Sequence, residues 1–221
     1  MRYLLGRDLS ALLVPAALIE TFARGWAQSR ALAPPLVIGG AHRIETGEPT
    51  ERRRFVFPRP PIGIAEIARS IVEPHILLKA AIDPADMAKL LPDGWHVERT
   101  GTTMTCAALP DTHPSVPPTL AVELGWTGDV CQARLIDSEG TEAARGRMTP
   151  IDDWALHDTI EVAPTHRRQG LGTAIMLLLG AEARRRGITR GLLNATDAGR
   201  ALYQRLGWQA RAPWTTAQIR A

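Results

Sequence analysis

The feature that most constrains this 221-residue chain is a short basic loop with two glycines, Arg167-Arg168-Gln169-Gly170-Leu171-Gly172. A β-like segment runs into Pro164 before the loop, and apolar residues at helical spacing follow it up to Leu178. The loop therefore opens a helix, whose first amides lack intrahelical partners and lie at the positive end of the helix dipole. Glycine has no Cβ, so an anion can approach this backbone closely, and the arginines add positive charge. These residues predict a site for a phosphate-bearing ligand.

Patterns on both sides of the loop predict an α+β chain with a mixed sheet. Before the loop, alternating apolar residues with turn chemistry between them predict strands at 120–126, 130–136, 141–148 and 159–162. The helix of the loop runs from 169 to Gly187, and a strand at 189–193, a helix at 198–206 and two closing strands around Trp208 and Trp214 follow. In the first half we expect helices at 8–28, 64–72 and 84–91, extended segments at 36–44, 55–57 and 75–82, and two short strands on either side of Thr100-Gly101.

A second motif makes the loop specific. It is the segment Thr196-Asp197-Ala198-Gly199-Arg200-Ala201-Leu202-Tyr203, which leads to Leu206-Gly207-Trp208. The pattern Arg167-x-x-Gly170-x-Gly172, followed by a helix with a Leu-Tyr pair and a Leu-Gly-aromatic turn, resembles the GNAT family of N-acetyltransferases. The resemblance covers about residues 119 to 221. Two features depart from the family: its two helices between the first and second strands are not recognisable, and Thr196 stands where many relatives have Asn.

The resemblance implies the GNAT acyl-CoA N-acyltransferase fold, with acetyl-CoA as co-substrate and direct attack of an amine on the acetyl group. In the family, the strand before the loop splays from its neighbour and pairs with the pantetheine arm. Here that strand is Ile160-Glu161-Val162, and the Val162 amide would donate to the thioester carbonyl. The implied cofactor contacts are Ile160, Val162, Arg167, Arg168, Gln169, Gly170, Leu171, Gly172, Thr173, Asn194, Thr196 and Gly199.

The resemblance also gives candidates for proton transfer. Tyr203 is the expected general acid, because a tyrosine keeps its proton at neutral pH and can give it to a departing thiolate. The alternative is that its ring only packs the helix against the sheet. Glu161 is the first choice for the base, with His157 and Asp153 behind it. Asp152 and Asp158 lie in the same region, and a base acting through ordered water stays open.

The first half of the chain resembles a degenerate repeat of the second. Leu78 to Asp83, a helix and Gly94-Trp95 parallel Leu193 to Asp197, a helix and Gly207-Trp208. We therefore expect a degenerate N-terminal GNAT-like lobe at 1–109, a proline-rich linker at 110–118 and the catalytic domain at 119–221. The alternative is one GNAT domain with an unusual N-terminal extension. Two separate V-shaped sheets would favour the first, and one continuous sheet the second.

Composition sets the remaining expectations. The chain is 45% hydrophobic and 22% charged with a net charge of +3, a balance that suits a packed core and a polyanionic ligand. No nucleic-acid motif is recognisable. Cys106 and Cys131 lack metal-ligand spacing and predict free thiols in a cytoplasmic protein. Residues 9–19 are read as part of an amphipathic helix, with a targeting segment as the alternative. No stretch reaches the ~20 apolar residues of a membrane span.

We therefore expect a transferase that acetylates a small-molecule or protein amine, without metal, nucleic-acid or membrane partners. A homodimer is an expectation by analogy only. Two other functions fit the same loop. One is a non-catalytic module that binds or senses CoA, and the other is a transferase that uses a longer acyl-CoA.

Overall fold

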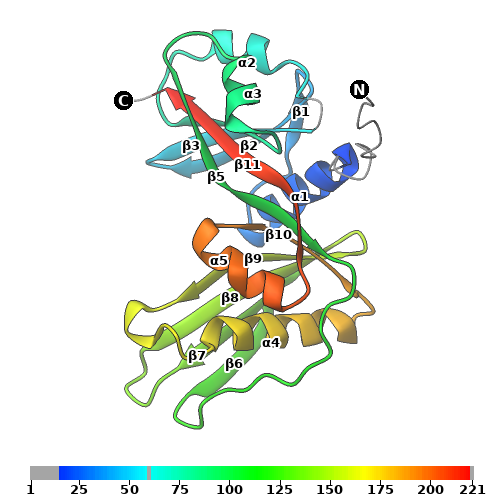
Figure 1. The fold of residues 1–221 in the computed structure, drawn as a ribbon, viewed down its shortest axis with the longest axis vertical. Coiled ribbons are helices and arrows are strands. Elements are labelled where there is room, and N and C mark those ends of the chain that lie inside the picture. Colours follow the sequence, from blue (N-terminus) through cyan, green and yellow to red (C-terminus); the bar gives the residue numbers. More distant parts are fainter. Residues whose placement is uncertain (1–14, 59–60, 220–221) are drawn as a thin grey trace, which may run out of the picture.

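The computed structural model describes residues 15–58 and 61–219. Within these residues, eleven strands form one continuous mixed sheet around which the helices pack (Figure 1). The strands are β1 (Leu36–Ile38), β2 (Ala41–Glu48), β3 (Glu51–Phe57), β4 (Ile76–Ala80), β5 (Trp95–Cys106), β6 (Ala121–Thr127), β7 (Val130–Ile136), β8 (Glu142–Ile151), β9 (Trp154–Val162), β10 (Arg190–Ala195) and β11 (Gln209–Ile219). The helices are α1 (Ala16–Ser29), α2 (Ile64–Ser70), α3 (Pro84–Ala88), the 3-10 helix η2 (Pro164–His166), α4 (Leu171–Arg185) and α5 (Asp197–Arg205).

The order of strands repeats one arrangement in the two halves of the sheet. The order is β1-β2-β3-β4-β11-β5-β10-β9-β8-β7-β6. In the first half, β2 is antiparallel to β3, β3 is parallel to β4, and β4 is antiparallel to β11. In the second half, β8, β9, β10 and β5 repeat the same directions. Helices α2 and α4 take equivalent places in this order, as do α3 and α5.

Two long strands, β5 and β11, belong to both halves. The start of β5 pairs with the end of β11 in the first half, and the end of β5 pairs with β10 in the second. Strand β11 is antiparallel to β5 from Gln209 to Ile219, and on its other edge Thr215–Ala217 pair with β4. The sheet is therefore continuous, as the alternative of a single domain expects. Its two halves nevertheless repeat one arrangement, as the alternative of two lobes expects. The division at 110–118 stays a prediction; residues 109–117 form no helix or strand.

Helices cover the two faces of the sheet differently. Along β9, Ala155 packs in the core beneath α4 and α5, whereas its neighbour Leu156 packs beneath α1, as alternation requires. The core beneath α1 also contains Ile44 and Val56, so this helix lies across both halves of the sheet. We call the side covered by α1 the α1 face and the opposite side the α4 face. Both cysteines are free and buried, as expected for thiols in a core.

The predicted strands at 120–126, 130–136 and 141–148 and the predicted helices at 169–187 and 198–206 are confirmed within a few residues, as β6, β7, β8, α4 and α5. The strand predicted at 159–162 is only the end of β9, which begins at Trp154. Two other predictions are wrong. The pair of strands expected around Thr100-Gly101 is the single strand β5, and the two closing strands are the single strand β11. The expected helix at 8–28 is α1 from Ala16 onward, and its earlier part lies outside the described residues, as does most of the alternative targeting segment.

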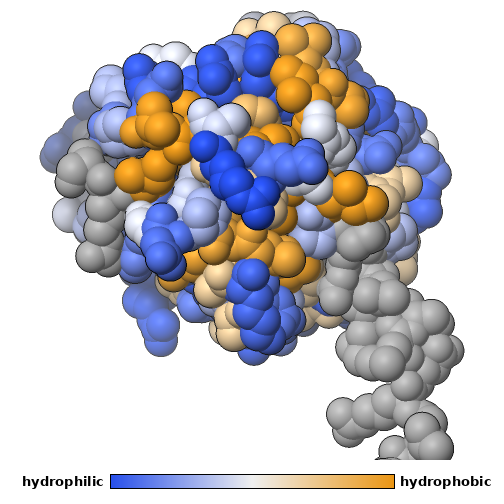
Figure 2. Space-filling view, turned by 90° about the horizontal axis from the view of Figure 1, so that it is seen from above, coloured by the Kyte–Doolittle hydropathy of each residue, from blue (hydrophilic) through white to orange (hydrophobic). Residues whose placement is uncertain are grey.

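The end of the molecule formed by the first half carries most of the exposed large apolar side chains. Leu36, Val37, Ile62 and Val72 are each more than half exposed. Figure 2 looks onto this end and shows several apolar areas with hydrophilic residues between them. No described helix is long and apolar enough to span a membrane.

Candidate cofactor and acyl-transfer site

The sheet opens between two parallel strands, β9 and β10. Their pairing joins Trp154–Leu156 to Arg190–Leu192 and goes no further in the described chain. Beyond Leu156, β9 stays paired with β8 as far as Val162, and β10 stays paired with β5 as far as Ala195. The second halves of the two strands therefore leave a gap with backbone on both sides. This is the splayed arrangement that the sequence implied for Ile160-Glu161-Val162.

A β-bulge in β9 lies where this strand separates from β10. Arg147 pairs with Asp158, but Arg145 pairs with Glu161, so β9 holds one residue more than β8 in this stretch. Thr159 within the bulge has a φ of 53°. A β-branched residue in the left-handed region costs roughly 1–3 kcal/mol, and such strain concentrates at functional sites. The bulge bends β9 away from β10 and creates the gap.

The basic loop connects this gap to α4. Arg168 and Gly170 have φ of 66° and 79°. The first amide of α4 with a described acceptor is that of Ala174, which donates to the Gly170 carbonyl; the amides from Gln169 to Thr173 donate to no described residue. A Cβ at Gly170 would meet no heavy atom within 4 Å, and the side chains of Arg167 and Arg168 are exposed. These amides are therefore free and accessible for an anion.

The second glycine of the loop also has a packing role. A Cβ at Gly172 would lie 2.8 Å from Leu202 Cδ1 and 3.6 Å from Val162 Cγ2. Gly172 thus lets α4 start close against α5 and β9. Leu171 is buried, so only its backbone faces the loop, and Thr173 is half-buried.

The equivalent position in the first half of the chain is closed. Gly63 precedes α2 with a φ of 80°, almost the same as that of Gly170. However, a Cβ at Gly63 would lie only 2.0 Å from the Gly39 carbonyl oxygen, because the turn between β1 and β2 covers this helix start. Among the described residues of the first half, there is therefore no second open loop of this kind.

Unpartnered buried polar atoms lie beside the gap. Both side-chain atoms of the Asn194 amide are buried without a hydrogen-bond partner in the described chain, and so is the Thr103 hydroxyl. Asn194 on β10 and Thr103 on β5 are register partners, so their side chains share the α1 face. Each buried polar group without a hydrogen bond destabilises the fold by roughly 1–3 kcal/mol, and a polar ligand in the gap would supply the missing partner. Thr103 gave no signal in the sequence, because only the register of β5 against β10 brings it here.

Thr196 and Gly199 stabilise the start of α5. The Thr196 hydroxyl accepts a hydrogen bond from the Gly199 amide at 3.2 Å. Thr196 is therefore the N-cap of α5. A Cβ at Gly199 would lie 3.0 Å from the Tyr203 ring, so the absence of a side chain here leaves room for that ring.

Tyr203 lies on α5 with its ring buried. The centre of the ring is 6.2 Å from that of Trp208. Burial, and after it the negative charge of Asp158, raise the pKa of Tyr203 to about 12. No described residue forms a hydrogen bond with its hydroxyl group. The phenol is therefore protonated at neutral pH and free to donate.

The carboxylates considered as bases all have cationic partners. Glu161 lies on the α1 face and pairs with Arg145 at 2.6 Å. Asp153 pairs with Arg190. Asp152 accepts hydrogen bonds from Thr21 and Arg24 of α1, and the bond from Arg24 is the main cause that lowers its pKa.

The other two candidates, His157 and Asp158, occupy different sides of β9. His157 is buried on the α4 face with its ring 5.2 Å from that of Trp208, and burial lowers its pKa to about 4. Asp158 faces α1, where it accepts hydrogen bonds from Ser29 at 3.1 Å and from Arg30. Sequence spacing could not reveal these contacts, since the partners are more than a hundred residues away.

Comparison with known proteins agrees with this geometry. Residues 131–210, from β7 into β11, match the family model described as the acetyltransferase (GNAT) domain.

Over this stretch the chain is similar to GNAT acetyltransferase domains.

Solved structures of GNAT proteins share its fold over nearly the whole chain. A GCN5-related N-acetyltransferase from Kribbella flavida is 15% identical with a TM-score of 0.65, and the match covers 92% of this chain and 96% of that one. An acetyltransferase of the GNAT family from Novosphingobium aromaticivorans is 18% identical with a TM-score of 0.57, over 90% and 96%. A tandem GNAT protein from the clavulanic acid biosynthesis pathway is 15% identical with a TM-score of 0.55, over 97% of both chains. No curated protein matches the chain.

These matches extend the GNAT-like architecture beyond the family model into the first half. The chain thus has the acyl-CoA N-acyltransferase fold, and the match to a tandem protein agrees with the repeated strand order. In the described part of the chain, no three His, Cys, Asp or Glu side chains gather to hold a metal ion.

Proposed function

We propose that the GNAT domain transfers an acetyl group from acetyl-CoA to a primary amine. The observation that carries this proposal is the open row of amides from Gln169 to Thr173 at the foot of the β9–β10 gap. A diphosphate would accept hydrogen bonds from these amides, with Arg167 and Arg168 beside it. The pantetheine arm would follow the gap along Ile160 and Val162 and reach the orphaned amide of Asn194. Thr196 and Gly199 would border this arm through the start of α5.

Acetyl-CoA supplies the thioester carbonyl that the amine nitrogen attacks. A C–N bond forms, the C–S bond breaks, and the thiolate takes a proton. In our proposal Tyr203 gives that proton, which its protonated state at neutral pH supports. The amine loses a proton to a base, for which Glu161 stays our first candidate, directly or through water. The Val162 amide would donate to the carbonyl oxygen as negative charge develops there.

A thiol-release assay with acetyl-CoA and a panel of primary amines tests this function. We expect Tyr203→Phe to slow turnover by about a hundredfold or more while CoA affinity is retained. Glu161→Gln should also slow turnover, whereas Glu142→Gln, which removes another partner of Arg145, should not. Unchanged turnover in either site variant would remove that assignment.

The same assay separates the alternative functions. Binding of CoA without thiol release from any acyl-CoA would identify a binding or sensing module. Release from longer acyl-CoAs in preference to acetyl-CoA would identify a different acyl donor.

A further inference from the structure

A hollow of about 490 Å³ opens on the α1 face, between the two halves of the molecule. The end of α1 forms one wall, the β2–β3 hairpin forms the second, and β8 forms the third. The side chains that matter for its chemistry are those of Trp26, Arg30, Glu51, Arg54 and Arg147. We call this hollow the arginine pocket. Two walls of the pocket thus come from the first half of the chain, and the third, with Arg147, comes from the second.

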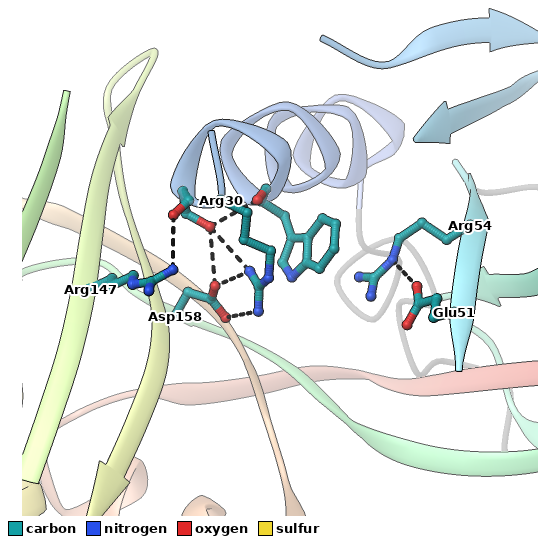
Figure 3. A network of polar contacts seen from close by, with 7 residues as sticks. Arg30, Glu51, Arg54, Arg147 and Asp158 are labelled. Atoms are coloured by element: carbon teal, nitrogen blue, oxygen red, sulfur yellow. Dashed lines mark hydrogen bonds and ion pairs between the residues drawn. The ribbon is translucent and has the colours of Figure 1, made fainter. Parts of the chain in front are cut away.

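Two of the three arginines are fixed in place by Trp26. The guanidinium of Arg54 lies 3.3 Å from the centre of the Trp26 ring, and that of Arg30 lies 4.0 Å from it. Arg54 also pairs with Glu51, and Arg30 pairs with Asp158 (Figure 3). Their side chains have therefore lost much of their conformational freedom before any ligand binds.

Among the three arginines of the pocket, Arg147 is the one that forms no ion pair with a carboxylate in the described chain. Its one described hydrogen bond goes to the Ser29 carbonyl at 3.3 Å, and no carboxylate in the described chain pairs with it (Figure 3). Lys79 lies nearby in the sheet, where burial and then repulsion from Arg54 lower its pKa to about 8. The other carboxylate of the pocket, Glu48, is exposed in the hairpin at its rim. The inner wall of the pocket therefore favours an anion.

Asp158, on the strand that borders the β9–β10 gap, lies next to two arginines of the pocket, since it pairs with Arg30. Arg147 and Asp158 are register partners on β8 and β9. Asp158 is also the residue at which β9 enters its bulge, and its charge acts on Tyr203. The Arg30–Asp158 pair thus stands between the arginine pocket and the place where the gap begins.

We propose that the arginine pocket is the acceptor site, and that it takes a primary amine that also carries an anionic group, a carboxylate or a phosphate. Arg147 and Arg54 would bind the anion through their planar forks, and the amine would point past Asp158 toward the gap. This proposal rests on the proposed function, since it names the substrate class of the same transferase. It also gives the first half of the chain a role in binding, although its own helix start is closed.

The test compares matched amines that differ in the anion alone. One pair is an α-amino acid and its amide, and the other is phosphoethanolamine and ethanolamine. In at least one pair, we expect the wild type to have a lower KM for the charged amine than for its neutral partner. The pair that shows this difference tells whether the pocket takes a carboxylate or a phosphate. Arg147→Gln should raise that KM roughly ten- to a hundredfold. It should leave the KM of the neutral partner and the affinity for CoA unchanged.

Arg53→Gln is the control, because Arg53 neighbours Arg54 on β3 but pairs with Glu45 outside the pocket. Equal effects of the two substitutions, or a wild type that does not distinguish the members of either pair, would overturn the proposal. Calorimetry of the same charged amines with CoA-saturated protein gives a readout that does not need turnover. Binding that Arg147→Gln abolishes supports the pocket even if no acetyl transfer occurs, and no binding to the wild type contradicts it.

Discussion

At the scale of single residues, His157 shows how packing changes the chemistry of a side chain. Its ring is buried between β9 and Trp208, with Nδ1 3.1 Å from the Ala155 carbonyl oxygen and Nε2 without a described partner. Burial disfavours the charged form and lowers the pKa to about 4. His157 is therefore neutral at pH 7, and it is a weaker base than its residue type suggested.

This lowered pKa makes folding stability depend on pH. The unfolded chain binds a proton at His157 below about pH 6.5, whereas the folded chain does so only near pH 4. The contribution is therefore fully present above pH 6.5 and is lost as the pH falls toward 4. At pH 5 the loss is about 2 kcal/mol.

We expect His157→Gln to remove this part of the pH dependence. Urea unfolding at pH 7.5 and pH 5 should give a smaller fall in the free energy of unfolding for the variant than for the wild type, by about 2 kcal/mol. Equal falls in the two proteins would show that His157 does not carry the dependence.

At the scale of elements, α4 rests directly on β8 at Gly146. A Cβ there would lie 2.4 Å from Ile175, 2.7 Å from Ile160 and 3.0 Å from Leu179. The absence of a side chain at this one position therefore sets how closely the helix of the basic loop approaches the sheet. The same contact brings Ile160, next to the bulge, under the helix.

The substitution Gly146→Ala should destabilise the fold by roughly 1–3 kcal/mol, because the added methyl overpacks this contact. Gly125→Ala is the matched control: Gly125 also lies in a strand, and its Cβ would meet no atom within 4 Å. Chemical denaturation measures both. A loss in Gly146→Ala no larger than that in Gly125→Ala would argue against close packing of α4 on β8.

The elements that the sequence predicted well are those with local signals. Alternation and turn residues marked β6 to β8 and the end of β9, and apolar spacing with glycine ends marked α4. The sequence predicts two short strands on either side of Thr100-Gly101, as if this glycine interrupted the strand, whereas β5 runs through it. In the structure Gly101 allows a close approach, since a Cβ there would lie 2.4 Å from the Ala195 carbonyl oxygen. A glycine in a strand has either meaning, and only the neighbouring strand decides between them.

The same limit applies to the candidate site. The loop from Arg167 to Gly172 is continuous in sequence, so its helix-start chemistry could be predicted. The contacts of Asp158 with α1 and the pairing of Asn194 with Thr103 depend on segments far apart in the chain. No spacing in the sequence encodes them.

At the scale of the whole molecule, the two halves depend on each other through β5 and β11. Strand β4 needs β11 from the second half as its neighbour, and β10 needs β5 from the first. Helix α1 adds a core that includes residues from both halves. Neither half has a complete sheet of its own.

A chain cut within the linker should therefore remain one particle. We expect a protease site placed between Asp111 and Pro118 to give two fragments that elute together in gel filtration and unfold in one transition. The fragment 119–221 made alone should lack cooperative unfolding. Separate elution of two folded fragments would show that the halves are independent domains.

The central claim is that the first amides of α4 bind the diphosphate of CoA. Calorimetry with CoA tests it most directly in the wild type, Gly170→Val and Gly187→Val. The two glycines lie just outside opposite ends of α4, have φ of 79° and 75°, and have no atom within 4 Å of a Cβ. Both substitutions therefore impose similar backbone strain, but only the side chain added at position 170 would stand beside the free amides. We predict that the wild type and Gly187→Val bind CoA and that Gly170→Val does not. Equal affinity in both variants, or no binding by the wild type, would contradict the claim.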